Sequence, residues 1–114
     1  MLGVAFSGPP LARASGGDGL GQPFRGPGDG TWEPGVVDWS DLAAHYLPRM
    51  TRRWHDAAQV PWLHDPATGL FISYDDAESL AIKRDYARGL GLGGVMIWEL
   101  SADDDAGTLL RAVQ

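Results

Sequence analysis

The stretch Gly93-Gly94-Val95-Met96-Ile97-Trp98-Glu99-Leu100 decides how the rest of the chain is interpreted. Two glycines precede an uninterrupted apolar run, and the polar, acidic segment 101–105 follows it. Continuous apolar character, without alternation, is typical of a strand that is covered on both faces, as in parallel sheets wrapped by helices. We therefore predict a buried strand at this position.

Helical patterns flank this strand on both sides. Residues 75–88 and 104–113 are each predicted to form a helix, and the resulting order of helix, strand and helix favours a βα-barrel or an open α/β sheet. In such folds the catalytic and ligand-binding residues lie at the carboxyl ends of the strands, which places Trp98 and Glu99 where a ligand would bind. A tryptophan in the hydrophobic core is the alternative interpretation of Trp98.

Length and composition narrow the class of protein. The 114 residues suffice for one small domain, whereas a complete eight-stranded barrel needs about 250 residues. A formal net charge of -6 without a clustered basic face argues against nucleic acid as a partner. No segment is long enough to span a membrane, and the apolar run Leu2–Phe6 is too short for a signal peptide.

The sequence predicts neither a metal site nor a cofactor. Cysteine is absent, and the spacing of His45, His55 and His64 puts no two of them on one helix face. The glycine-rich runs 16–19 and 89–94 lack the lysine of a phosphate-binding loop and the strand and helix that surround a dinucleotide site.

The first half of the chain contains a short strand, a glycine- and proline-rich segment and a helix. Residues 2–6 predict a buried strand, and residues 9–30, which show no periodicity, predict either a flexible linker or a long binding loop. Residues 38–47 show helical spacing, with Asp38 as the expected cap and Pro48 as the stop.

The second half continues with three β-prone runs, 53–56, 60–63 and 70–74, which predict an antiparallel meander with Trp54 and Trp62 in its core. The helix 77–88 that follows is expected to carry a capping box made by Asp75 and Glu78. One face of that helix is expected to pack against the sheet through Ile82, Tyr86 and Leu90. The last helix is expected to be capped by the acids Asp103 to Asp105.

Aromatic residues repeatedly lie beside acids: Trp32 with Glu33, Trp54 with Asp56, Tyr74 with Asp75, and Trp98 with Glu99. Such pairs suit carbohydrate, because the apolar face of a sugar ring stacks on an aromatic side chain while its hydroxyls form hydrogen bonds. A loop tryptophan folded back on the core is the alternative for Trp32.

Taken in order, these motifs resemble the C-terminal part of a bacterial chitinase of glycoside hydrolase family 18. The resemblance rests on four stretches that span nearly the whole chain: Gly30-Thr31-Trp32-Glu33-Pro34-Gly35-Val36-Val37-Asp38, Trp54-x-Asp56 with Pro61, Ile72-Ser73-Tyr74-Asp75-Asp76-x-x-Ser79-x-x-x-Lys83, and Gly93 to Ser101 with Asp103.

The resemblance implies an incomplete (β/α)8 TIM barrel, of fold class α/β, that carries an α+β insertion domain. Residues 1–8 would hold the seventh barrel strand, 9–30 a loop, 31–74 the insertion domain, and 75–114 the seventh helix, the eighth strand and a C-terminal helix. The substrate would be chitin or chito-oligosaccharide. Trp98 would form the floor under the sugar at the cleaved bond, Trp32 and Glu33 would line the cleft, and the family is extracellular.

Two departures from the family pattern set the expected function. The family's seventh strand usually ends in Tyr-Gly-Arg, and the matching positions here are Ser7, Gly8 and Pro9. The catalytic motif D-x-x-D-x-D-x-E is absent. Asp38 and Asp41 begin such a pattern, but Ala43 and His45 break it. The family uses the last glutamate as general acid in a substrate-assisted reaction. We therefore expect no catalytic residue in this chain, no hydrolysis by the chain alone, and a missing N-terminal barrel half as its partner.

Two alternatives to an enzyme part remain open. One is a non-catalytic module that binds chito-oligosaccharide, and the other is a truncated reading frame without independent function.

Overall fold

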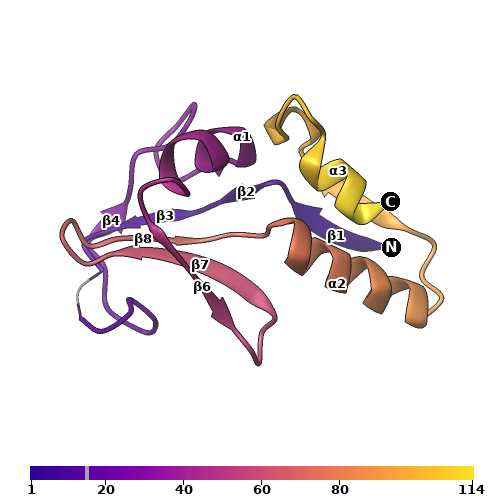
Figure 1. The fold of residues 1–114 in the computed structure, drawn as a ribbon, viewed down its shortest axis with the longest axis horizontal. Coiled ribbons are helices and arrows are strands. Elements are labelled where there is room, and N and C mark those ends of the chain that lie inside the picture. The colour runs from indigo at the N-terminus through magenta and orange to yellow at the C-terminus, as the bar shows by residue number, and fades with distance from the viewer. Residues whose placement is uncertain (15) are drawn as a thin grey trace.

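The computed structural model describes residues 1–14 and 16–114, and it contains two connected parts (Figure 1). In the first part, strand β1 (Leu2–Ala5) pairs in parallel with β9 (Val95–Trp98), in a register that sets Leu2 beside Val95 and Ala5 beside Trp98. Helices α2 (Ala77–Gly89) and α3 (Thr108–Val113) pack on this pair, so the predicted order of helix, strand and helix is confirmed.

The prediction that residues 93–100 form a strand buried on both faces is wrong. Val95 and Ile97 are half-buried against the core, whereas Met96 and Trp98 are 48% and 69% exposed. The side chains alternate because α2 and α3 cover only one face of the two-stranded sheet. The second face, to which Gly3 and Ala5 of β1 also belong, is open to solvent.

Helix α2 begins one residue later than the predicted capping box. Asp76 is the N-cap, its carboxylate accepts a hydrogen bond from the Ser79 N–H at 3.0 Å, and the Ser79 hydroxyl accepts one from the Asp76 N–H at 2.9 Å. Asp75, the predicted cap, instead forms an ion pair with Lys83 at 2.6 Å. The shift follows from the extended backbone of Asp76, whose φ of -124° places it just outside the helix.

The face of α2 that packs inward also differs from the prediction. Leu80 and Ala87 are buried, whereas Tyr86 and Leu90 lie exposed. The helix turns Leu80 toward the core that it shares with Leu109 of α3, and this contact outweighs the apolar spacing of the opposite face.

The last helix is shorter than predicted but capped as expected. A 3₁₀ turn, η2 (Leu100–Ala102), comes first, and α3 starts after Gly107, which has a left-handed backbone. The Asp104 carboxylate accepts from the Thr108 N–H at 2.9 Å, and the Asp103 carboxylate accepts from the next two N–H groups of the helix. The interpretation as caps is confirmed for Asp103 and Asp104, whereas no capping hydrogen bond is formed by Asp105 among the described residues.

The second part of the structure is an antiparallel five-stranded sheet with the order β4-β3-β8-β7-β6. Strands β6 (Thr51–His55), β7 (Val60–Asp65) and β8 (Leu70–Ser73) form the predicted meander. Strands β3 (Pro10–Ala12) and β4 (Gly26–Pro27) complete it, so the range 9–30 is not a loop throughout.

Residues 16–22 of that range lie over one face of the sheet. The Trp62 indole N–H donates to the Asp18 carbonyl at 3.0 Å, and a side chain at Gly19 would come within 2.8 Å of both His64 and Phe71. The glycine content that suggested flexibility therefore allows a close approach to the sheet. Trp62 is buried under this segment, while Trp54 is half-buried beside Arg52.

The opposite face of the sheet carries a helical segment that connects the two parts. Helix α1 (Trp39–Asp41) continues as a π-helical turn, η1 (Leu42–Tyr46), and the predicted helix 38–47 is therefore confirmed with a wider final turn. Short strands β2 (Ser7–Gly8) and β5 (Val37–Asp38) pair just before it. One core runs through both parts of the molecule, and its largest fully buried members are Phe6, Leu42, Leu63, Ile72, Leu80 and Leu109.

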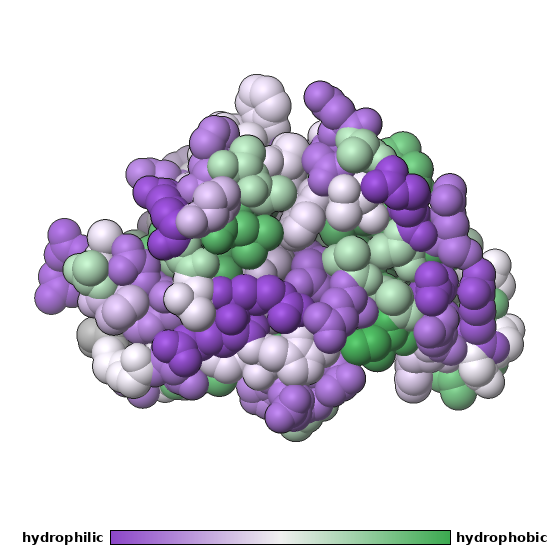
Figure 2. Space-filling view, viewed as in Figure 1, coloured by the Kyte–Doolittle hydropathy of each residue, from purple (hydrophilic) through white to green (hydrophobic). Residues whose placement is uncertain are grey.

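On the face shown in Figure 2, hydrophilic side chains form a band across the middle of the molecule, with apolar areas above it and to its right. In the part of the chain that the structure describes, no helix is both long enough and apolar enough to cross a membrane.

Candidate functional site

Trp98 lies at the carboxyl end of β9, on the open face of the two-stranded sheet. Its carbonyl accepts a hydrogen bond from the Phe6 N–H at 3.0 Å, which fixes the backbone of Trp98 to the end of β1. The peptide bond between Trp98 and Glu99 is cis. The indole is exposed, and its neighbour across the sheet, Ala5, has a small side chain. The alternative of a core tryptophan is therefore wrong for this chain.

Trp32 lies on a tight turn that precedes β5. Glu33-Pro34-Gly35-Val36 forms a turn in which the Val36 N–H points to the Glu33 carbonyl and Gly35 has a φ of 89°, as a type II turn requires. A side chain at Gly30 would collide with the Glu33 carbonyl oxygen, so glycine is needed there for the turn to close. The Trp32 side chain is 86% exposed, and the alternative of a tryptophan folded back on the core is wrong.

Asp38 connects Trp32 with the end of β1. Its carboxylate accepts the Trp32 indole N–H at 2.9 Å, and its backbone pairs with Ser7, which directly follows β1 and Phe6. Asp38 was predicted to cap the helix 38–47, but its side chain makes no capping hydrogen bond there. The Asp38 carboxylate bonds to Trp32 instead of to the helix N-terminus. The sequence signal for this bond is that Trp32 and Asp38 lie on either side of one tight turn.

These contacts bring the predicted site residues to one region. The Trp98 carbonyl is bonded to the Phe6 N–H, the backbone of Asp38 pairs with Ser7, and the Asp38 carboxylate accepts the Trp32 indole N–H, so Trp98 and Trp32 are both connected to the segment that directly follows β1. Glu33 is exposed beside Trp32. Two accessible aromatic rings with carboxylates nearby can stack on a flat apolar surface and accept hydrogen bonds from its polar edges.

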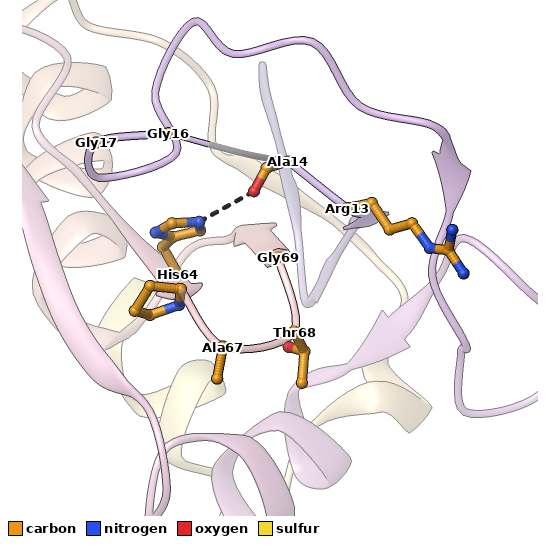
Figure 3. Close-up of a pocket in the computed structure, with 9 residues that line it drawn as sticks. Arg13, Ala14, Gly16, Gly17, His64, Ala67, Thr68 and Gly69 are labelled. Carbon is orange, nitrogen blue, oxygen red and sulfur yellow. Dashed lines mark hydrogen bonds between the residues drawn. The ribbon is translucent and has the colours of Figure 1, made fainter.

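A separate cavity of about 330 Å³ lies at the far end of the five-stranded sheet (Figure 3). It is lined by the segment around Arg13 and Gly16 and by the turn 66–69, which are at the left in Figure 1. His64 is buried at this cavity, and its Nε2 lies 3.2 Å from the Ala14 carbonyl oxygen. The sequence did not predict this cavity, because it forms between segments about 50 residues apart.

Within residues 1–14 and 16–114, no three side chains of His, Asp or Glu converge as metal ligands would. His45 Nδ1 lies 2.7 Å from one Asp41 carboxylate oxygen, and the other oxygen of Asp41 accepts a hydrogen bond from the Thr31 hydroxyl.

Two ionisable groups, the buried Tyr74 and the partly exposed Asp104, lie on either side of Trp39. Tyr74 stacks on Trp39 with 6.4 Å between ring centroids, and burial, with the charge of Asp76 added, raises the pKa of its hydroxyl well above the ordinary value despite the opposing effect of Arg52. The Trp39 indole N–H donates to Asp104 at 3.0 Å. Burial alone would raise the pKa of Asp104, but hydrogen bonds from Thr108 and Trp39 hold it below its ordinary value.

Comparison with known proteins relates this chain to a family of glycosidases. Residues 1–103 match the family model described as glycosyl hydrolases family 18. The chain is 46% identical over 107 residues to chitinase A1 of Niallia circulans, and the alignment covers 90% of this chain and 15% of that protein. It is 45% identical over 62 residues to chitinase B of Serratia marcescens, covering 54% of this chain and 12% of that protein. The chain thus spans a small part of the length of these relatives.

Solved structures agree with the sequence comparison. A chitinase from Rhizomucor miehei superposes with a TM-score of 0.86 at 30% identity, over 100% of this chain and 37% of that one. Human YKL-39, described as a pseudo-chitinase with retained chitooligosaccharide binding, gives a TM-score of 0.90 at 27% identity, over 99% of this chain and 33% of that one. The family match over residues 1–103, together with these relatives, shows that the chain belongs to the glycosyl hydrolases of family 18.

Proposed function

We propose that the chain is the C-terminal portion of a chitinase barrel. In this proposal β1 and β9 are the seventh and eighth barrel strands and α2 is the seventh helix. The segment 31–74, joined by β3 and β4 of the same sheet, is the α+β insertion domain. The parallel pairing of β1 with β9 supports this assignment, because consecutive strands of such a barrel are parallel neighbours joined through a helix, here α2. The share of the relatives that the chain spans supports it as well.

The function that the site supports best is binding of chitin or chito-oligosaccharide in a substrate cleft. The observation that carries this proposal is the exposed indole of Trp98 at the carboxyl end of β9, where barrel enzymes place their ligands. Trp98 acts as the floor under a sugar ring, and Trp32 and Glu33 line the cleft beside it. N-acetylglucosamine units suit this site, since their flat faces stack on indoles while hydroxyl and amide groups bond to carboxylates.

The chain by itself does not hydrolyse its ligand in this proposal. Cleavage of a glycosidic bond needs an acid that protonates the leaving oxygen, and the family motif that supplies it does not occur in the 114 residues. Catalysis then depends on further barrel strands, which would also cover the open face of the β1–β9 sheet. A second function, binding without hydrolysis, is favoured by the same exposed rings, and YKL-39 is a relative described in those terms.

Titration calorimetry with N-acetylchitohexaose tests the proposal, with cellohexaose as the matched ligand that lacks the N-acetyl groups. We expect the chitin oligomer to bind and the cellulose oligomer to bind more weakly. We also expect no shorter oligomers after prolonged incubation of the purified chain. Equal affinity for both ligands would contradict the assigned substrate class, and cleavage lost on substitution of a residue in this chain would contradict the assigned inactivity.

A further inference from the structure

We infer that Asp38 is a positioning residue, whose carboxylate sets the orientation of Trp32 as a stacking surface. This inference rests on the proposed function, because it assigns a role to Trp32 in sugar binding. Its physical basis is the hydrogen bond from the Trp32 indole N–H to the Asp38 carboxylate at 2.9 Å. A bond to an ionised acceptor is about twice as strong as one between neutral groups.

The two partners of this bond differ sharply in burial. Trp32 is 86% exposed, whereas Asp38 is 8% exposed. An exposed tryptophan without a partner moves among its rotamers, but a buried carboxylate attached to a strand cannot follow it. The bond therefore restrains the ring from the protein side and leaves both of its faces open to a ligand.

Asp38 is itself held from two directions. Its backbone pairs with Ser7 of β2, and its N–H donates to the Thr31 hydroxyl at 3.0 Å. The Thr31 hydroxyl in turn donates to the Asp41 carboxylate at 2.8 Å. Asp38 is thus fixed relative to the end of β1, and the Trp98 carbonyl is bonded to Phe6 at that same end.

The backbone that carries Trp32 adds a second restraint. The Thr31 N–H donates to the Val36 carbonyl at 2.9 Å, and Pro34-Gly35 forms the corner of the turn between them. With the backbone closed and the indole N–H bonded, little rotamer freedom remains to be lost on binding. Immobilising a free side chain would weaken binding by about 2- to 12-fold, from the general cost of ordering a side chain at an interface.

A double-mutant cycle tests this role. N-acetylchitohexaose is titrated into the wild-type chain, Asp38→Ala, Trp32→Ala and the double variant. We expect Asp38→Ala to weaken binding by about 2- to 12-fold when Trp32 is present and to have no further effect when it is absent. Asp38→Asn should restore most of the affinity, since its carbonyl oxygen can accept the same indole N–H. Equal losses in both backgrounds would overturn the inference.

A second measurement needs no ligand and no substitution at Asp38. In the wild-type chain, the indole ¹H–¹⁵N signal of Trp32, identified by its loss in Trp32→Phe, is expected downfield of the Trp98 signal and less sensitive to temperature. The Asp104→Ala variant is the matched control, because it removes the carboxylate partner of Trp39 and should leave the Trp32 signal in place.

The two measurements separate the inference from the function on which it rests. If the chain binds no chito-oligosaccharide but the Trp32 indole is hydrogen-bonded, the proposed function fails and the positioning contact stands. If the Trp32 and Trp98 indole signals respond alike to temperature, the positioning inference fails whatever the affinity.

Discussion

Replacing Trp98 by alanine should separate a binding residue from a structural one. Trp98 has about a third of its surface buried, since 69% is exposed, whereas Trp62 is only 7% exposed. A fully buried tryptophan removes about 200 Å² from water. At about 25 cal/mol per Å², truncation of Trp98 should therefore lower the free energy of unfolding by at most about 1.5 kcal/mol, and truncation of Trp62 by about 4.5 kcal/mol.

For binding we expect the opposite ranking, with Trp98→Ala affected more than variants at the tryptophans of the meander. Loss of an aromatic stacking surface costs about 1–3 kcal/mol, so Trp98→Ala should raise the Kd for N-acetylchitohexaose by about 5- to 150-fold. Trp54→Ala serves as the matched control, because Trp54 lies in β6, away from the carboxyl end of β9. Its affinity should stay close to that of the wild-type chain.

Urea unfolding followed by circular dichroism and calorimetric titration of the same samples give both quantities. A folded Trp98→Ala protein with unchanged affinity would refute the assignment of Trp98 to the binding site. A loss of unfolding free energy in Trp98→Ala as large as that in Trp62→Ala would refute the reasoning from exposure.

Three further predictions concern stability. The buried Tyr74 hydroxyl has no hydrogen-bond partner among the described residues, so Tyr74→Phe should leave the free energy of unfolding unchanged or raise it by about 1 kcal/mol; a loss greater than this in urea unfolding would be inconsistent with an unpartnered hydroxyl. Gly19→Ala should destabilise by more than about 1 kcal/mol, because Gly19 has a φ of 88° and its added methyl group meets His64 and Phe71; Gly17→Ala, with positive φ but open space, should lose less, and equal losses would contradict the crowding argument. Because the pKa of Asp104 is lowered on folding, its carboxylate contributes stability that is present above about pH 4 and lost in more acid solution. Asp104→Asn should therefore flatten the acid limb of a plot of unfolding free energy against pH. An unchanged limb would count against this contribution.

Local patterns predicted the elements whose signal lies within a few residues. The meander 51–73 follows from short β-prone runs between turns, and the acids before α3 follow from the preference of helix N-termini for carboxylates. Boundaries were less well predicted. Asp75 and Asp76 are both suitable caps in sequence, and only the backbone conformation selects Asp76.

Patterns that depend on distant partners were predicted poorly. The glycine-rich range 9–30 indicated a flexible linker or a long binding loop, yet Pro10–Ala12 joins the sheet by pairing with β8, about 60 residues away. The helix α2 presents Leu80 rather than Tyr86 to the core, because α3 packs on that side. Amphipathic spacing shows that a helix has an apolar face, but where two faces carry apolar residues it does not show which neighbour is available.

For the candidate site, the sequence alone predicted which residues bind the ligand. Aromatic residues beside acids, in the order of the family motifs, were sufficient to name Trp32, Glu33 and Trp98. Only the tertiary structure decided that Trp98 stands on an open face and that Asp38 bonds to Trp32 instead of capping a helix. The physical reason is that exposure and hydrogen-bond partners are set by the pairing of β1 with β9 and of β2 with β5, contacts between residues that are 93 and 31 positions apart along the chain.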